Sequence, residues 1–335
     1  MNIEEKFNEF YNKFLNENRD NFDELEFLRK NSVSERKRNI IFILIVDIFL
    51  LVICLLAINY FSSYNKETVE NIGFFCLNLI WIFPIIIALT SRNKLKRYEK
   101  LYKEKIINNL IKTFCSSLQY SPNDGINYED FKKVNFEHFN NFYSSDLISG
   151  IYMCDEITIS KIITEYDSST GFNNRDVHYE TFDGAFAKVK WPQKANIELY
   201  IKPKKTLTDN LNNIFLKDIN QVSKSNNEDK LLKNNYNEIK IPELDNIFNL
   251  YSSNPELAKN IFNSEINEIL IDIYNIEKFC ISIKDSYIYM QFWISGLFSS
   301  PPIEKETYDR EYIYKNYKML YIIFYLSSVF KKNVT

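Results

Sequence analysis

Two apolar segments near the N-terminus constrain this chain more than any other feature. Of the nineteen residues 40–58, sixteen are Ile, Leu, Val or Phe, and the apolar run continues to Phe61. Residues 72–90 form a second run of nineteen residues without a charge. As a helix, a run of this length spans a hydrocarbon core of about 30 Å. The sequence therefore predicts a transmembrane hairpin of two helices, 39–61 and 72–90, joined by an external loop at 62–71.

Asp47 and Pro84 interrupt the two segments. One Asp at a helix centre costs roughly 2.5 to 3.5 kcal/mol on an insertion scale, which the apolar residues at about −0.3 to −0.6 kcal/mol each outweigh. Pro84 would kink its helix and release a backbone carbonyl, which a protonated Asp47 could bind. An intramembrane carboxylate usually faces a partner or carries a proton or ion, so Asp47 is a candidate functional residue. The alternative is a tolerated acid that snorkels to the membrane edge or packs in a helix dimer.

The charges beside the two segments predict their orientation. The connection 62–71 carries one Lys against two Glu, whereas basic residues flank the outer ends of the hairpin. By the positive-inside rule, this is a multi-pass protein of the cell (inner) membrane with both termini in the cytoplasm. A cleaved signal peptide is the poorer interpretation, because almost forty residues precede the first apolar run. The flanking basic residues are Arg36, Lys37, Arg38, Arg92, Lys94, Lys96 and Arg97.

Amphipathic helices are predicted on both sides of the hairpin. In the cytoplasmic segment 1–38, Phe7, Phe10, Tyr11 and Phe14 have the spacing of one helix face. In the juxtamembrane segment 91–120 a similar apolar stripe continues from the second span. The two stripes either pack against each other or rest on lipid headgroups. The second stripe consists of Leu95, Tyr98, Tyr102, Ile106, Leu110 and Phe114.

Downstream of the turn cluster 121–125, the chain is predicted to form a cytosolic α+β domain at 126–335, with antiparallel strands packed with helices. Ile, Thr and Tyr in strand-like lengths predict strands within 150–166, and 182–189 is expected to pair with 197–201 around the turn 191–194. The polar stretch 209–237 is expected to be an exposed excursion.

The rest of this domain mixes strand and helix signals. Residues 247–251 predict a strand, followed by a helix that starts at Asn254-Pro255-Glu256 and buries Ile266, Ile269, Leu270 and Ile273. Residues 279–283 and 287–293 predict a hairpin around Lys284-Asp285-Ser286. A last helix is expected at 304–330, and its apolar run 319–330 is too short to span a membrane and predicts a buried core helix.

These segments resemble the bacterial family of unknown function DUF3137, whose members combine an N-terminal membrane hairpin with a cytosolic domain. The resemblance runs from about Phe139 to the end. In its Phe182-Asp183-Gly184-Ala185-Phe186 motif, Asp183 replaces the usual Lys, and in a later motif Lys259 replaces Arg. The resemblance implies fold and topology, and the family brings no activity with it. The segments that carry it are 145–150, 157–166, 182–186 and 247–258.

Composition excludes several classes of function. With only six Gly, the chain has no dinucleotide fingerprint or phosphate-binding loop. Two His and five unclustered Cys provide neither a zinc site nor a disulfide framework, so no cofactor or metal is expected. A net charge of −3 does not favour nucleic acid. An enzyme is therefore the less favoured interpretation, although a carboxylate site at Asp155, Glu156 or Glu165 stays open.

One local basic cluster is a candidate binding surface. Six lysines lie around Trp191 on the predicted pair of strands 182–189 and 197–201. They could contact anionic lipid headgroups, at about 1 kcal/mol per cation, or an acidic partner. Alternatively they protect an exposed sheet edge from aggregation. The cluster consists of Lys188, Lys190, Trp191, Lys194, Lys202, Lys204 and Lys205.

Together these patterns predict a bilayer anchor that presents a cytosolic interaction or scaffold domain to a protein partner or a second copy of the chain. The rival function is a membrane-surface enzyme that acts on lipid or peptide through carboxylates. Two of those acids converging in an apolar cleft would distinguish it. Transport is poorly supported, because two helices enclose no pathway unless the protein oligomerises.

Overall fold

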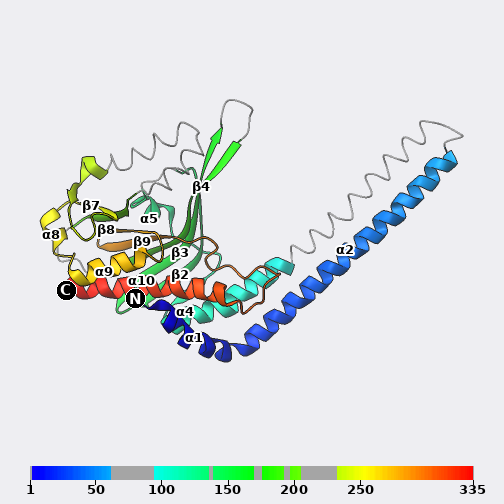
Figure 1. Ribbon diagram of the computed structural model, residues 1–335, viewed down its shortest axis with the longest axis horizontal. Helices are drawn as coiled ribbons and strands as arrows, with labels where there is room; N and C mark the ends of the chain where they lie inside the picture. Colours follow the sequence, from blue (N-terminus) through cyan, green and yellow to red (C-terminus); the bar gives the residue numbers. More distant parts are fainter. Residues whose placement is uncertain are drawn as a thin grey trace. The chain divides into compact units, whose positions relative to one another are not determined.

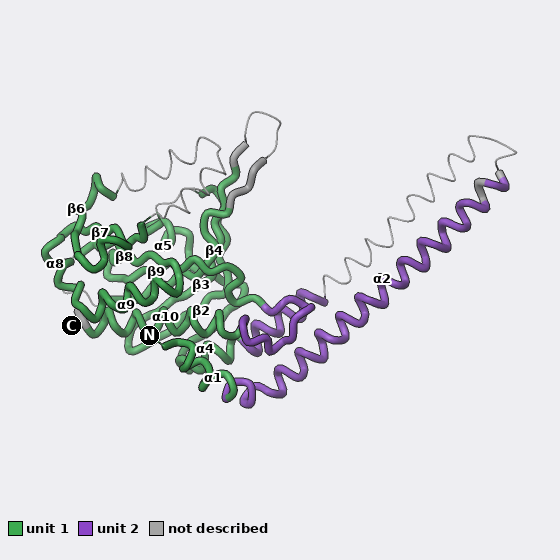
Figure 2. The backbone as a smooth tube through the Cα atoms, in the orientation of Figure 1, with its two compact units in different colours: residues 1–12, 107–299, 313–335 green, residues 13–106, 300–312 purple. Residues whose placement is uncertain are grey.

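A computed structural model describes residues 2–61, 94–135, 139–169, 176–191, 197–204 and 232–334. The chain divides into two compact units, which Figure 2 shows in different colours. The sheet unit comprises residues 1–12, 107–299 and 313–335, and the helical unit comprises residues 13–106 and 300–312. The predicted second transmembrane helix and the external loop lie outside the described residues, and so does most of the predicted polar excursion.

The sheet unit is built on one nine-stranded sheet in which all the described pairings are antiparallel (Figure 1). The strand order is β1-β2-β3-β4-β9-β8-β5-β7-β6. This confirms the predicted mixture of helices with an antiparallel sheet. The strands are β1 (Gln119–Ser121), β2 (Asn141–Tyr152), β3 (Asp155–Ser169), β4 (Asp176–Lys190), β5 (Leu199–Pro203), β6 (Asn237–Ile239), β7 (Phe248–Ser252), β8 (Phe279–Lys284) and β9 (Tyr287–Trp293).

Helices α9 (Ser264–Tyr274) and α10 (Arg310–Val334) pack on one face of this sheet. This face is apolar because the strands alternate their side chains, and Ile281 and Met290, which face each other across β8 and β9, are both buried. The ring of Phe248 in β7 lies 5.3 Å from that of Tyr274 in α9. The run 319–330 of α10 is largely buried, as predicted for a core helix.

The short helix α5 (Tyr128–Lys132) packs on the opposite face of the sheet. Its Phe131 is fully buried, 5.7 Å from the ring of Phe182 and 5.3 Å from that of Phe186 in β4. Ile162 and Tyr289 belong to the same buried cluster. The sheet therefore has a core on each face.

The predicted pairing of 182–189 with 197–201 is wrong. Strand β4 pairs with β3 and β9, whereas β5 pairs with β7 and β8. The hairpin β8–β9 therefore lies between the two strands that were expected to be neighbours. Local turn residues at 191–194 suggested a hairpin, but the long-range pairing of β9 with β4 decides the order.

The hairpin between β8 and β9 is confirmed. Asp285 and Ser286 connect the strands, with φ angles of 50° and 63°. Two successive residues with positive φ form the type I′ turn, whose twist matches that of a tight antiparallel hairpin. Polar residues with short side chains accept this conformation more readily than most others do.

The helix predicted to start at Asn254 is two helices. Asn254 caps α8 (Pro255–Lys259), and its side chain accepts a hydrogen bond from the backbone N–H of Leu257. Asn263 caps α9 in the same way, with the N–H of Ile266 as donor. The predicted buried face belongs to α9. Asn263 starts a new helix because its side chain accepts a hydrogen bond from the amide of Ile266. In a continuous helix, that amide would donate to a backbone carbonyl one turn earlier.

Helix α1 (Ile3–Glu17) confirms the predicted amphipathic helix, but its first turns pack on α10. Phe7 is fully buried, and its ring lies 4.9 Å from that of Tyr314 and 5.3 Å from that of Tyr317. The ring of Phe10 stacks on Tyr317 at 4.6 Å. Local sequence patterns do not indicate this contact, because α10 lies about three hundred residues away in the chain.

In the helical unit, α2 (Arg19–Phe61) is one continuous helix of 43 residues. Its first turns are buried in protein, with Phe22 at 4% and Leu25 at 0% exposure. Between residues 40 and 56, most of its large apolar side chains are 43–64% exposed, whereas Ile43, Val46 and Leu50 are partly buried. By length and composition, this helix is long and apolar enough to cross a membrane. It supports membrane anchoring by the predicted first span, whereas a two-helix hairpin is not described.

The juxtamembrane stripe is covered by protein along most of its length. Residues 94–102 are helical and continue into a π-helix (Lys103–Ile107) and α4 (Asn108–Phe114). Tyr98, Tyr102 and Ile106 are at most 1% exposed, whereas Leu95 is 43% exposed. These buried rings are inside the protein, so the interpretation that the whole stripe rests on lipid headgroups is wrong.

Candidate functional site

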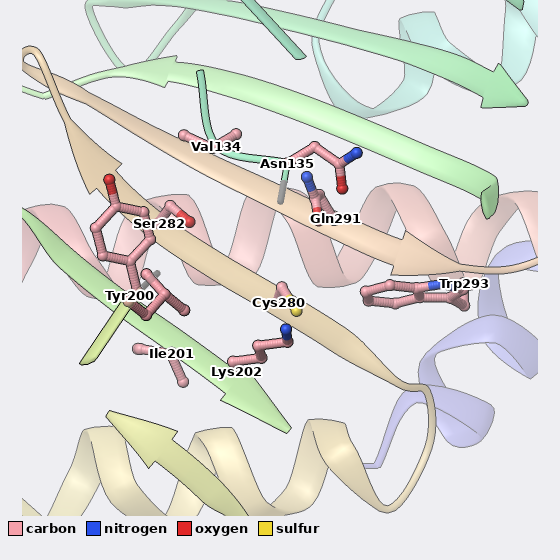
Figure 3. Close-up of a pocket in the computed structure, with 10 residues that line it drawn as sticks. Val134, Asn135, Tyr200, Ile201, Lys202, Cys280, Ser282, Gln291 and Trp293 are labelled. Carbon is pink, nitrogen blue, oxygen red and sulfur yellow. The ribbon is translucent and has the colours of Figure 1, made fainter. Parts of the chain in front are cut away.

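A pocket opens on the α5 face of the sheet, over strands β5, β8 and β9 (Figure 3). Its cavity volume is about 30 Å³. Several polar side chains converge on it, which distinguishes it from the surrounding apolar core. The lining residues are Val134, Asn135, Tyr200, Ile201, Lys202, Leu232, Cys280, Ser282, Gln291 and Trp293.

The strand register places three polar residues in one row across the pocket floor. Cys280 in β8 lies opposite Gln291 in β9. Ile201 lies opposite Ile281, so the next residue of β5, Lys202, comes level with Cys280. Side chains directly opposite each other on one sheet face have Cβ atoms about 5 Å apart. The row Lys202, Cys280, Gln291 is therefore a product of strand pairing between segments that are far apart in sequence.

Gln291 has the most unusual position in this row. Its side chain is 6% exposed, and its Nε2 has no hydrogen-bond partner among the described residues. Buried amide groups are hydrogen-bonded in the great majority of cases, because losing water without a replacement partner is costly. The carboxamide lines the pocket in Figure 3, so a group inside the pocket could meet this requirement.

Lys202 is the one charged residue in the described lining, and no carboxylate shares that lining. A second cation is nearby, because the Nζ of Lys278 lies 5.4 Å from the centre of the Trp293 ring. The Trp293 ring therefore lines the pocket and also makes a cation–π contact with Lys278.

A chain of hydroxyl groups borders the pocket at Tyr200. The hydroxyls of Tyr200 and Tyr236 are 3.3 Å apart, and Tyr236 donates to Glu198 at 2.6 Å. Lys284 lies 3.7 Å from the same carboxylate. Burial raises the pKa of Tyr200, and the neighbouring Tyr236 and Glu198 raise this pKa further. Tyr200 therefore stays protonated, and it lines the pocket as a neutral side chain with a hydroxyl group.

Gly184 allows the wall at Trp293 to form. It lies opposite Trp293 in the pairing of β4 with β9, and a Cβ at this position would come 1.8 Å from the backbone oxygen of Phe292. Only glycine fits there. Phe182, two residues earlier, packs edge-on against Trp293 at 5.2 Å. This contact explains the Phe-Asp-Gly-Ala-Phe motif physically.

The lysine cluster predicted from the sequence is dispersed. Lys188 in β4 donates to Asp130 at 2.8 Å and lies over the ring of Tyr287. Lys190 is 3.9 Å from Glu156, and both side chains are more than half exposed. Trp191 is buried against α10, with its ring 6.2 Å from that of Phe330.

The β5 half of the cluster is separate from the β4 half. Lys202 lines the pocket, and Lys204 donates to the backbone oxygen of Asp245. Lys194 and Lys205 lie outside the described residues. The strands β8 and β9 lie between β4 and β5, so Lys202 and Lys204 are on a different strand pair from Lys188 and Lys190. Contact with anionic lipid stays a prediction.

Asp47 lies within the apolar half of α2, on a half-buried side of the helix. Its Oδ1 has no hydrogen-bond partner among the described residues. Both interpretations of this residue stay predictions, because the second span lies outside the described part of the chain.

The three acids of the rival enzyme hypothesis do not converge. Asp155 at the start of β3 is paired with Lys331 at 2.5 Å. Glu165 lies ten residues along the same strand, or roughly 33 Å at the rise of an extended chain. Glu156, beside Asp155, is 65% exposed at its side chain. Among the described residues, no three His, Cys, Asp or Glu are grouped as metal ligands.

A larger hollow of about 350 Å³ lies between α1, α4, β2 and α10. Seven aromatic rings line it, and Tyr317, Tyr321 and Tyr325 stack along α10. Lys6 donates to the Tyr321 hydroxyl at 2.7 Å, so these two polar groups satisfy each other. The smaller pocket therefore has the stronger case for a ligand that is held by hydrogen bonds.

Sequence reasoning missed Gln291, Cys280 and Ser282. A signal was present, because Cys280 and Ser282 alternate with apolar residues along β8, and Gln291 interrupts an otherwise aromatic and aliphatic strand. A polar residue at a strand position expected to be buried is more informative than an apolar one.

The fold and the pocket define a mixed helix and antiparallel-sheet protein with a long apolar N-terminal helix. Residues 180–332 match the model of a family described as protein of unknown function, DUF3137, which confirms the predicted resemblance over this range. The range contains all three strands beneath the pocket.

No curated protein matches the sequence. The crystal structure of the mycobacterial trehalose monomycolate transport factor A, TtfA, is similar at 8% identity over 64% of this chain and 92% of that chain. Its TM-score of 0.30 is too low to assign a common fold.

Proposed function

We propose that this protein is a bilayer-anchored interaction module. Two transmembrane helices hold both termini and the sheet unit on the cytoplasmic side of the cell membrane. There the sheet unit binds a protein partner or a second copy of the chain. Neither a cofactor nor a catalytic group is required for this function.

One observation carries the proposal: α2 changes from protein-packed to largely exposed along a single uninterrupted helix. Leu25 is fully buried, whereas Ile48 and Phe49 are each 64% exposed. Exposing a continuous apolar surface of this size to water is unfavourable at about 25 cal/mol per Å². Lipid is the natural surrounding for the second half of the helix, and the buried first half fastens the anchor to folded protein.

Cys154 provides a test of the topology. This exposed thiol lies in the turn between β2 and β3. In intact cells a membrane-impermeant maleimide should leave it unlabelled, and should label it after the membrane is opened. Cys154→Ala is the matched control for the site of labelling. Lys66→Cys, in the predicted external loop, should be labelled in intact cells. Labelling of Cys154 in intact cells would contradict the cytoplasmic orientation.

A crosslinking experiment tests the interaction. Two copies of the full chain with different tags are expressed together, crosslinked in native membranes, and purified through one tag. We expect either the second tag or one reproducible partner protein in the crosslinked band. Finding neither would contradict an interaction module and favour the surface enzyme, for which the separation of Asp155 and Glu165 offers no support.

A further inference from the structure

The aromatic hollow between α1, α4, β2 and α10 is large enough for a small organic molecule. Its cavity volume of about 350 Å³ falls within the roughly 300–1,000 Å³ that is usual for ligand sites. Its rings pack against one another across elements that are far apart in sequence. Phe10 stacks on Tyr317 at 4.6 Å, and the ring of Tyr152 lies 4.5 Å from that of Phe324. The described lining consists of Phe10, Thr113, Phe114, Tyr152, Tyr317, Tyr321, Phe324, Tyr325 and Ser328.

The lining of this hollow is aromatic and uncharged. Seven of the nine described lining residues carry an aromatic ring, and none of the nine carries a charge. An aromatic ring has a negative face, which attracts a cation that lies within about 6 Å of the ring centre. The remaining polar groups of these side chains are hydroxyls, whose oxygen lone pairs also favour a positive charge. The lining therefore suits a cation better than an anion.

One cation of the chain already uses this property at the edge of the hollow. The Nζ of Lys6, an exposed residue of α1, lies 5.0 Å from the centre of the Tyr321 ring and donates to its hydroxyl. This hydrogen bond raises the pKa of Lys6, so the surroundings favour the charged ammonium. Lys6 itself is not part of the lining.

Nearby carboxylates add a negative potential at two of the tyrosines. Burial raises the pKa of Tyr317, and Tyr321 and the charge of Glu9 raise it further. Burial also raises the pKa of Tyr325, with smaller contributions in the same direction from Glu265 and Asp272. A potential that disfavours a phenolate favours a cation at the same place. The rings and their surroundings therefore act in the same direction.

The absence of a carboxylate from the described lining limits the kind of cation. A primary ammonium carries three N–H donors, which need acceptors once water is excluded. The described side chains of the lining offer hydroxyl oxygens only. A quaternary ammonium group has no N–H donor, and its methyl groups can pack against the faces of aromatic rings.

We propose that this hollow binds a quaternary ammonium group such as that of choline. The methyl groups contact the rings of Tyr317, Tyr321 and Tyr325, and no hydrogen bond is required to hold the charge. A free solute and a phospholipid head group present the same group. This site is independent of the proposed anchoring function, and either can fail without the other.

Saturation-transfer NMR observes such a ligand directly. The full chain is placed in nanodiscs of phosphatidylglycerol, which has no methylated ammonium, and its aromatic protons are irradiated. Choline chloride is titrated to about 20 mM at constant ionic strength. We expect saturable transfer to the N-methyl protons. The neutral carbon analogue of choline, 3,3-dimethyl-1-butanol, should bind about tenfold more weakly.

A second lipid distinguishes the two sources of the ligand. The titration is repeated in nanodiscs of phosphatidylcholine whose N-methyl groups are deuterated. If the hollow takes a lipid head group, this lipid should compete and reduce the transfer to free choline. If it takes only the free solute, the transfer should equal that in phosphatidylglycerol.

Two substitutions at Tyr325 separate the ring from the hydroxyl. Tyr325→Leu should weaken choline binding by about threefold or more, because it removes one aromatic face, whereas Tyr325→Phe should retain the affinity. Tyr143→Leu is the control for a lost tyrosine, since Tyr143 is 55% exposed and lies outside the lining. Thermal unfolding of the three variants shows whether a loss of binding reflects misfolding.

Lys6→Gln tests the sign of the ligand's charge. Lys6 is exposed, so this variant should fold, and it removes a cation that competes for the ring of Tyr321. Choline should therefore bind about twofold more tightly or better. Lys13→Gln removes the same charge farther along α1, where Lys13 pairs with Glu17, and should have a smaller effect.

Three results would overturn the proposal. Without saturable transfer, the hollow holds solvent only. If choline and its neutral analogue bind equally, the hollow recognises an apolar shape and not a charge. If Lys6→Gln weakens the binding of choline, the potential of the hollow does not favour a cation.

Discussion

Glu26 in α2 accepts two hydrogen bonds from Thr307, one from its backbone N–H at 3.1 Å and one from its hydroxyl at 3.0 Å, although 281 positions separate them. The same carboxylate binds Arg29 through two further hydrogen bonds, at 2.9 and 2.6 Å. Tyr98 donates to the Thr307 hydroxyl at 3.2 Å, and Arg29 donates to the backbone oxygen of Ile303. This buried polar cluster fastens residues 300–312 to the protein-packed start of α2.

The stability of the helical unit should therefore fall in acid. Burial alone would raise the pKa of Glu26, but the hydrogen bonds from Arg29 and Thr307 outweigh it and lower the pKa from 4.5 to about 2. A lowered folded-state pKa stabilises the fold above pH 4.5, and this contribution is lost as the pH falls from there to about 2. At one pKa unit per 1.36 kcal/mol, the total is roughly 3 kcal/mol. Thermal unfolding followed across this pH range should show the loss.

Glu26→Gln should loosen the segment at neutral pH, because it leaves the Arg29 charge buried without its partner. Hydrogen exchange at the Thr307 amide should accelerate by about tenfold or more. Glu24→Gln is the control, since Glu24 pairs with Lys105 but its side chain is 51% exposed. Equal exchange in the two variants would show that the cluster does not hold the segment.

Gly184→Ala should destabilise the sheet unit by about 3 kcal/mol or more, because the new methyl group would meet the Phe292 oxygen at 1.8 Å. Gly296→Ala is the comparison. There the nearest atom is 3.6 Å away, so the new methyl group has space. The cost comes from placing Ala in the left-handed conformation at φ +66°, which is about 1 kcal/mol. Equal losses in chemical denaturation would refute the close approach of β4 and β9.

Lys188 and Lys190 should behave differently although both belong to the predicted cluster. Lys188→Met should cost about 1–2 kcal/mol, because it leaves a three-quarters-buried Asp130 with the longer ion pair to Lys133 at 3.7 Å and removes the contact with Tyr287. Lys190→Met should change stability by less than about 0.5 kcal/mol, because its pair with Glu156 is exposed. Both are measurable by thermal unfolding in detergent. If Lys188→Met does not change the thermal stability, the ion pair between Lys188 and Asp130 has no structural role.

Phe7→Ala should release α1 from α10. A fully buried Phe cut back to Ala costs about 3–5 kcal/mol through lost contacts and the cavity it leaves. Limited proteolysis should then cleave within α1 at a higher rate. Phe27→Ala, at a position 65% exposed, should leave the cleavage rate unchanged. Resistance of both variants to protease would mean that α1 does not depend on this ring.

The local elements followed from the sequence because the forces that specify them are local. An apolar run interrupted by one Asp predicted the exposed half of α2, and four aromatic residues at helical spacing predicted α1. Asn254 before Pro255 predicted a helix start, because the Asn side chain can accept a hydrogen bond from a backbone amide that has no partner within the helix. The β8–β9 hairpin followed from a short polar turn between two apolar strands. The family resemblance was also readable from short motifs, which retain the same order and spacing.

Tertiary structure alone decided which distant segments meet. Nothing local at 182–201 indicated that the hairpin β8–β9 would separate β4 from β5, because strand order depends on long-range pairing and on how each face is covered. The row Lys202, Cys280, Gln291 exists only through that order. The bonds from Thr307 to Glu26 likewise depend on chain closure over 281 positions. Spacing and composition determined the helices, the hairpin and the long apolar segment, whereas burial and strand register determined which polar groups converge.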